Sequence, residues 1–205
     1  MDQLYNELKK YGEVKYNVPL AKLTTFQIGG PAKYLIEVTE TDKLTDLLSF
    51  LSGAGEQYFI LGGGSNLLMP DNGYDGVVIK IAINKIDTQD NKIIVTAGTP
   101  LASVVNAASK NELTGMEWAI GIPGTVGGAV RGNAGAMGKE TANCLKSVIV
   151  WQNGEVKEMT NEECGFHYRG SNFKDNGAVI LAATFELKKG DKNEIMQTMQ
   201  GYIKQ

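Results

Sequence analysis

The spacing of apolar residues in the first part of the chain predicts a β-α-β unit. A helix is expected from about residue 42 to 52, because four leucines recur at the i, i+3, i+4, i+7 spacing of one buried face: Leu44, Leu47, Leu48 and Leu51. Short apolar runs on either side, at 34–38 and 57–61, have the length and residue types of strands. Before this unit, residues 2–11 predict a short helix that Gly12 ends, followed by an irregular stretch.

The pattern after residue 70 predicts a second set of strands and helices. Strand-like GVVIKI and NKIIVTAG precede a helix whose N-cap we place at Thr99, with Pro100 at the first helical position. SVIVWQ and EVKEM flank Asn153-Gly154, a dipeptide typical of two-residue hairpin turns. A capping box at Thr160-x-x-Glu163 and the strand AVILAATFELKK follow.

A final helix is expected to begin at Asp191. It carries an apolar stripe that needs a partner: Ile195, Met196, Met199, Tyr202 and Ile203. Either the stripe packs on a segment beyond Gln205, where the sequence stops, or the helix docks back on the body of the protein. We therefore divide the chain into a first lobe at 1–69, a second lobe at 70–190, and a helix at 191–205 leading to an absent C-terminal domain.

Composition narrows the class of protein. With 42% hydrophobic and 21% charged residues, the 205-residue chain is typical of a globular protein with a substantial core. A net charge of −3 and the lack of a Lys/Arg cluster argue against a nucleic-acid-binding face. The polar amino terminus is unlike a signal peptide, and no apolar run reaches the roughly 20 residues that span a bilayer. Two cysteines are too few for a disulfide scaffold, so we expect a reduced cytoplasmic protein.

Two glycine-rich segments are the main candidates for ligand binding: LGGGSNLL at 61–68 and GIPGTVGGAVRGNAGAMG at 121–138. Glycines leave successive backbone N–H groups free to point at an anion, so two such segments suggest a long ligand with a central diphosphate. The alternatives are a tight turn for the first and a flexible surface loop for the second. Apolar residues embedded in the second favour a packed segment: Ile122, Pro123, Val126, Ala129 and Val130.

Several well-known motifs are excluded by single residues. Leu67 stands where a Rossmann fingerprint, or a nucleophile elbow around Ser65, requires glycine. Glu140 follows Lys139, so no Walker A lysine–hydroxyl pair is present. Cys164 and His167 have metal-like spacing, but one histidine and two cysteines in the whole chain make a zinc site a poor hypothesis.

Phe166-His167-Tyr168-Arg169 is the third candidate feature. The arginine is either a surface cation or, if it faces a pocket, the group that holds a carboxylate or the negative charge of a reduced cofactor. The residues themselves leave both interpretations open.

Four segments, in this order, resemble one family closely: TTFQIGGPA, LGGGSNLL, the GMEW–GIPGTVGGAVRGNAGAMGKE block and FHYRGSNF. The family is UDP-N-acetylenolpyruvoylglucosamine reductase, and the match runs from about Leu20 to Lys189. The resemblance implies an α+β, two-lobed FAD-binding fold of the PCMH/vanillyl-alcohol-oxidase type, with FAD bound non-covalently between the lobes. It also implies NADPH as the reductant and a UDP-sugar, UDP-N-acetylglucosamine enolpyruvate, as the substrate in peptidoglycan synthesis. We expect no nucleic acid or membrane partner, and a monomer is favoured.

The resemblance assigns roles to particular residues. The FAD diphosphate would be held by backbone N–H groups of Gly62, Gly63, Gly64, Ser65, Asn66 and Leu67. The flavin end and the adenosine-linking region would contact Ile122, Pro123, Gly124, Thr125, Gly127, Gly128, Ala129, Asn133, Gly135 and Arg169. Arg169 would also be the catalytic residue that polarises the enolpyruvyl carboxylate, with Tyr168 beside it in substrate binding.

The sequence also departs from the family. The family's serine general acid, in a GSxFxNP-like segment, and its late glutamate have no counterpart in these 205 residues, and neither does the UDP-binding domain. We therefore expect the FAD-binding part of the reductase, deficient in turnover. Alternatives are a non-catalytic FAD- or nucleotide-binding module and another FAD-linked oxidoreductase of the superfamily. A purely structural α+β domain would have to treat both glycine segments as accidental.

Overall fold

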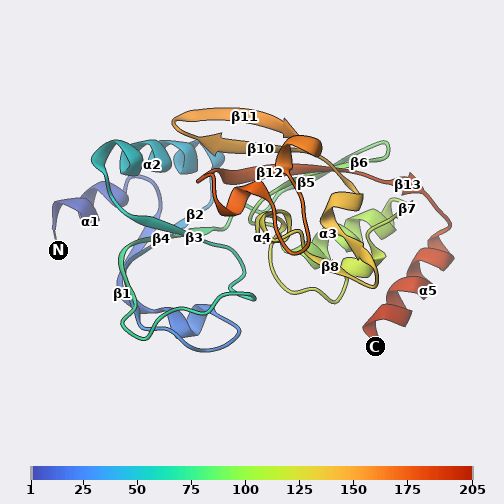
Figure 1. Ribbon diagram of the computed structural model, residues 1–205, viewed down its shortest axis with the longest axis horizontal. Helices are drawn as coiled ribbons and strands as arrows, with labels where there is room; N and C mark the ends of the chain where they lie inside the picture. The colour runs from blue at the N-terminus through green and yellow to red at the C-terminus, as the bar shows by residue number, and fades with distance from the viewer. Residues whose placement is uncertain (1, 205) are drawn as a thin grey trace. The chain divides into compact units, whose positions relative to one another are not determined.

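A computed structural model describes residues 2–204, which divide into two units (Figure 1). The first unit runs to Ile83 and includes Asn153–Val156; the second comprises Asn84–Gln152 and the chain from Lys157 onward. Each unit has a sheet of its own.

The first unit is built on a four-stranded sheet of order β1-β2-β4-β3. Its strands are β1 (Glu13–Pro19), β2 (Pro31–Val38), β3 (Tyr58–Leu61) and β4 (Tyr74–Ile81). The β-α-β unit is confirmed, with β4 lying between its two strands and parallel to both. The expected irregular stretch is wrong at Glu13–Pro19, where β1 pairs antiparallel with β2, while residues 24–30 do lack regular structure. This edge strand exposes most of its side chains, so it has no apolar alternation to reveal it.

The placement of β4 moves the boundary between the units. Val77, Val78 and Ile79 are fully buried in the centre of the first sheet. The first unit therefore extends to Ile83, whereas the division expected from the sequence falls after residue 69 and assigns this strand to the second lobe.

Two helices accompany this sheet. The first, α1 (Gln3–Leu8), begins where the Asp2 carboxylate accepts a hydrogen bond from the Tyr5 N–H at 3.1 Å. The second, α2 (Thr41–Ala54), is the predicted leucine helix, and all four of its leucines are fully buried. It ends at Gly55, which adopts the left-handed conformation (φ 69°) that glycine tolerates best.

The second unit contains a five-stranded sheet of order β11-β10-β12-β6-β5. Its strands are β5 (Ile86–Gln89), β6 (Lys92–Thr96), β10 (Leu145–Gln152), β11 (Glu155–Thr160) and β12 (Val179–Glu186). The hairpin prediction is confirmed, because Asn153 and Gly154 both have positive φ, at 53° and 87°. The strand β5 is absent from the sequence-based prediction, since most of its side chains are exposed.

Helices α3 (Leu101–Lys110) and α4 (Val126–Arg131) lie on one side of this sheet (Figure 1). The predicted N-cap at Thr99 is wrong by one residue: Pro100 occupies the N-cap position, and the buried Thr99 hydroxyl instead lies 3.1 Å from that of Thr96. Short paired strands and single turns complete the chain: η1 (Leu20–Leu23), β7 (Leu113–Thr114), η2 (Glu117–Ala119), β8 (Gly135–Ala136), β9 (Lys139–Glu140), η3 (Thr141–Asn143), η4 (Glu162–Cys164), η5 (Asn172–Lys174) and β13 (Lys188–Lys189).

The final helix, α5 (Lys192–Ile203), begins as predicted at Asp191, whose carboxylate accepts hydrogen bonds from the N–H groups of residues 193 and 194. Ile195 is buried, and Met199 and Tyr202 pack against the core of the second unit. These three residues therefore dock on the body of the protein, as one of the two alternatives expected. The other two apolar residues of the stripe are exposed: Met196 and Ile203. Across residues 2–204, no helix is both long and apolar enough to cross a membrane.

Candidate functional site

The first glycine segment forms the loop that leaves the carboxyl end of β3. Within residues 2–204, no group accepts a hydrogen bond from the backbone N–H of any residue in 62–66. Five consecutive free N–H donors at the carboxyl end of a parallel strand are suited to an anion such as a phosphate. A tight turn between strands does not need them, so this geometry favours the ligand-binding interpretation.

The loop borders a cavity of about 350 Å³ within the first unit. The residues that line it come from three segments: Lys22, Leu23, Thr24, Thr25, Leu61, Gly62, Gly63 and Lys80. The N–H of Thr25 donates to the carbonyl oxygen of Gly64 at 3.0 Å, which ties the loop to the TTFQIGGPA segment. A Cβ on Gly64 would overlap the carbonyl oxygen of Leu23, so only glycine allows this close approach.

Two lysines line the cavity, and within the described part of the chain one of them is not paired with a carboxylate. Lys80 Nζ lies 2.8 Å from a carboxylate oxygen of Glu37, whereas Lys22 forms no ion pair with any residue in 2–204. Free N–H groups, threonine hydroxyls and an unpaired ammonium match the chemistry of a diphosphate, so the donors of this cavity fit FAD. The TTFQIGGPA segment contributes to the family resemblance, but the sequence did not predict a ligand-binding role for its threonines, Thr24 and Thr25. It also did not predict one for Lys22 or Lys80.

The second glycine segment is a packed structure rather than a flexible loop. Val126 and Val130 are fully buried in α4. The N–H groups of Val126 and Gly127 donate at 2.9 Å to the carbonyl oxygens of Thr99 and Ala97, so the backbone itself occupies these donors. The residues of this stretch that the resemblance assigns to FAD line neither of the two cavities, and their cofactor contacts stay a prediction: Ile122, Pro123, Gly124, Thr125, Gly127, Gly128 and Ala129.

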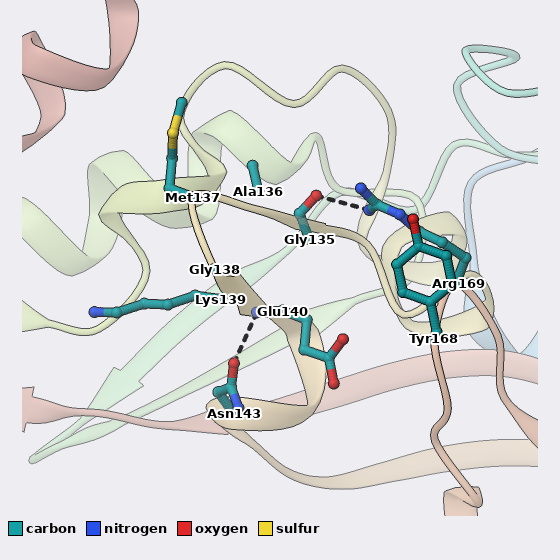
Figure 2. Close-up of a pocket in the computed structure, with 9 residues that line it drawn as sticks. All are labelled: Gly135, Ala136, Met137, Gly138, Lys139, Glu140, Asn143, Tyr168 and Arg169. Carbon is teal, nitrogen blue, oxygen red and sulfur yellow. Dashed lines mark hydrogen bonds between the residues drawn. The ribbon is translucent and has the colours of Figure 1, made fainter.

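The end of this segment lines a second cavity, of about 410 Å³, within the second unit. Its lining residues are Gly135, Ala136, Met137, Gly138, Lys139, Glu140, Asn143, Tyr168 and Arg169. Figure 2 shows the Arg169 guanidinium directed at Gly135, whose carbonyl oxygen accepts from Nη1 at 2.7 Å, and Lys139 extending away from it. The fold thus brings the predicted Gly135, Tyr168 and Arg169 together, while sequence reasoning did not predict residues 137–140 as a lining.

Arg169 occupies an unusual backbone conformation. It is the second central residue of a two-residue turn closed by hydrogen bonds between His167 and Gly170, of 3.1 Å and 3.0 Å. Its φ of 55° lies in the region that favours glycine, and non-glycine residues held there are concentrated at functional sites. Tyr168 beside it is 85% exposed. Of the two interpretations that the sequence leaves open, the structure supports a cation at the edge of a cavity.

Other polar side chains have structural explanations. The capping box is confirmed: the Thr160 N–H donates to Glu163 Oε2 at 2.7 Å, and this hydrogen bond lowers the pKa of that carboxyl. Burial raises the pKa of the Cys144 thiol to about 12 and that of Cys164 to about 11. Among residues 2–204, no group of three His, Cys, Asp or Glu side chains is placed to hold a metal ion.

Comparisons with known proteins show the family to which the chain belongs. Residues 32–160 match the model of the FAD binding domain family. The chain is 42% identical over 189 residues to the UDP-N-acetylenolpyruvoylglucosamine reductase of Carboxydothermus hydrogenoformans, and 39% identical over 201 residues to that of Limosilactobacillus reuteri. The chain belongs to this reductase family. These alignments cover 91% and 97% of the chain.

A solved structure supports the same assignment. The crystal structure of UDP-N-acetylenolpyruvylglucosamine reductase from Thermus caldophilus superposes with a TM-score of 0.79 at 35% identity, and the match covers 94% of this chain. The predicted family and α+β FAD-binding fold are therefore confirmed, with FAD the ligand named by the matching domain family. The chain spans 63%, 67% and 68% of the lengths of these three reductases.

Proposed function

We propose that this chain holds FAD for the NADPH-dependent reduction of UDP-N-acetylglucosamine enolpyruvate to UDP-N-acetylmuramate, a step of peptidoglycan synthesis. The run of free N–H donors at 62–66, inside the matched residues 32–160, carries the proposal. When bound, the flavin supplies the hydride-transfer chemistry that amino-acid side chains lack.

The first cavity supplies the binding part of this function. Gly62 and Gly63 would donate N–H groups to the diphosphate, continued by Gly64, Ser65, Asn66 and, by resemblance, Leu67. Lys22 adds a positive charge that no carboxylate of the described residues neutralises. A site that combines backbone dipoles with one free cation binds an anion locally, so it is compatible with a net charge of −3.

The second cavity supplies the candidate catalytic residue. One donor of the Arg169 guanidinium is occupied by Gly135, which leaves its other N–H groups for the carboxylate of the enolpyruvyl group. Tyr168 lies next to it with most of its ring accessible, as substrate contact requires. A guanidinium paired with that carboxylate would withdraw electron density and make the adjacent carbon easier to reduce.

The alternative is an FAD-binding module without turnover of its own. It is supported by the matching domain family over residues 32–160, whose name states FAD binding and no reaction. Such a module would bind FAD without reducing the enolpyruvyl substrate.

The test combines a flavin titration with a turnover assay. The purified chain is expected to retain a flavin absorbance spectrum after excess FAD is removed, and Gly63→Asp to weaken FAD binding by about tenfold, because a carboxylate beside the diphosphate is repelled. Gly53→Asp is the control, since Gly53 lies in α2 with no atom within 4 Å of an added Cβ. Equal FAD affinity of the Gly63→Asp and Gly53→Asp variants would contradict the proposed site. In the turnover assay, NADPH oxidation that depends on substrate would indicate the enzyme, and its absence would indicate the non-catalytic module.

A further inference from the structure

Three hydrogen bonds join the segment 131–135 to the turn that carries Arg169. The Ser171 hydroxyl donates to the carbonyl oxygen of Arg131 at 2.8 Å. Asn133 Nδ2 donates to the carbonyl oxygen of His167 at 3.1 Å, and Arg169 Nη1 donates to Gly135. Residues 133 and 135 thus each bond to a residue of the turn, residue 131 bonds to the residue just after it, and we call this set of bonds the arginine brace.

Asn133 is the central member of the arginine brace. Its side chain is fully buried, and its Oδ1 also accepts a hydrogen bond from the Ala142 N–H at 3.1 Å. Its backbone has a positive φ of 42°, which asparagine tolerates better than most residues. Both polar atoms are therefore used inside the protein, and the side chain has no exposed surface to offer to a ligand.

The brace acts on a turn that needs support. Arg169 has a φ of 55°, a conformation that costs free energy for a residue with a Cβ and persists only where its surroundings enforce it. Asn133 fixes the residue at the start of the turn, and Ser171 fixes the residue just after its end. Lys174 Nζ holds the Arg169 carbonyl oxygen at 2.5 Å, on the backbone of the same turn.

We propose that Asn133 is a positioning residue that, together with Ser171, fixes the direction of the Arg169 guanidinium at the second cavity. This inference rests on the proposed function, in which that guanidinium receives the substrate carboxylate. It replaces the expectation that Asn133 contacts the cofactor. A catalytic group displaced by about 1 Å can lose about 100-fold in rate, so a residue that never touches substrate can still control turnover.

Asn133→Asp tests the proposal with almost no change in size. The new carboxylate can still accept a hydrogen bond from the Ala142 N–H, but it cannot donate one to the His167 carbonyl. Its second oxygen therefore faces the carbonyl oxygen of His167, and two acceptors repel each other. In the holoenzyme with FAD, turnover is expected to fall by about 100-fold while FAD affinity changes by less than about twofold. Asn161→Asp is the matched control: it loses two hydrogen bonds of 2.8 Å to main-chain carbonyls of the same unit but none to the turn. Equal losses of turnover in the two variants would overturn the proposal.

A second readout does not depend on turnover. The chain has only two arginines, Arg131 and Arg169, so their guanidinium N–H signals can be assigned by NMR with Arg131→Lys. In Asn133→Asp, the guanidinium N–H signal of Arg169 should shift and its protons should exchange faster with water, while the Arg131 signal stays in place. An unchanged Arg169 signal would overturn the inference. A wild-type holoenzyme without turnover would contradict the proposed function alone. If circular dichroism shows Asn133→Asp to be unfolded, Ser171→Ala, which removes one bond of the brace, is held to the same criteria.

Discussion

Gly64 and Arg169 both adopt positive φ values, of 67° and 55°, for different reasons. Gly64 must lack a side chain because its Cα lies against the carbonyl oxygen of Leu23. Arg169 keeps its side chain, which hydrogen-bonds to Gly135, while Asn133 holds the His167 carbonyl at the start of the same turn. At the residue scale, the two candidate sites therefore depend on backbone conformations that ordinary residues avoid.

Arg169→Lys is expected to reduce kcat/KM for substrate reduction by about 10–100-fold, because lysine keeps the charge but loses the planar set of donors. FAD affinity should change little. The control is Arg131→Lys, which makes the same exchange at the other arginine. Its guanidinium lies on the surface and, among residues 2–204, hydrogen-bonds to the carbonyl oxygen of Lys174 alone, at 3.4 Å. Steady-state NADPH oxidation measures both variants, and a normal rate for Arg169→Lys would exclude the proposed role.

Cys144 gives a prediction about pH. Burial raises the pKa of its thiol from 9.0 to about 12. At a pH between these two values the thiol is therefore neutral in the folded chain but ionised in the unfolded chain. Its contribution to stability is therefore full below about pH 9 and is lost as the pH rises toward about 12. The loss of stability on Cys144→Ala should be smaller at about pH 10 than at about pH 8, by about 1.4 kcal/mol. Urea unfolding at both pH values checks this, and an identical loss would contradict it.

Only part of the candidate site could be predicted residue by residue. Three consecutive glycines, and an arginine directly after Phe166-His167-Tyr168, are unusual sequences, so Gly62 and Arg169 could be identified directly. Lys22, Thr25 and Lys80 are ordinary residue types, and they line one cavity only because the fold brings segments distant in sequence together. The arginine brace joins residues 34 to 40 positions apart through single hydrogen bonds, which leave no periodic signal.

At the scale of elements, burial decided what could be predicted. The helix α2 buries one face completely and the hairpin at Asn153 has a required turn sequence, so both were predicted. The strands β1 and β5 expose most of their side chains. Their pairing depends on main-chain hydrogen bonds, which any residue except proline can make, so the sequence carries little trace of them.

The buried face of α2 should dominate its contribution to stability. Leu47→Ala is expected to lower the free energy of unfolding by about 2–5 kcal/mol, because it leaves a cavity in a fully buried position. Leu68→Ala makes the same change where the side chain is 67% exposed and should cost less than about 0.5 kcal/mol. Chemical denaturation followed by circular dichroism compares the two; similar losses would mean that α2 packs less tightly than described.

At the scale of the whole molecule, the family assignment and the two-unit division agree with the sequence, while the position of the boundary does not. The sequence-based boundary follows the glycine-rich loop at 61–68, which the sequence suggests as the end of the first lobe, so it assigns β4 to the second lobe. The pairing of β4 with both β2 and β3 is a long-range property, and a run of apolar residues does not state which sheet it joins.

Binding of FAD should stabilise the fold by mass action. At a free FAD concentration about 100 times Kd, the free energy of unfolding is expected to rise by about 2.7 kcal/mol if only the folded chain binds. Thermal unfolding at increasing FAD concentrations measures this, with Gly63→Asp expected to require more FAD for the same shift. If the midpoint of thermal unfolding did not change with FAD concentration while the flavin spectrum showed binding, the unfolded chain would have to bind FAD as well.

The position of β4 also affects how the protein is made. A ribosome releases the chain from its amino end, so β1, β2 and β3 emerge before the strand that lies between two of them. Until β4 arrives, β2 and β3 have facing edges with no strand between them, and such edges invite pairing with other chains. The glycine loop is therefore synthesised before the sheet that will order it. A slow stretch of translation between residues 66 and 74 would lengthen the interval in which a nascent chain is most exposed to aggregation.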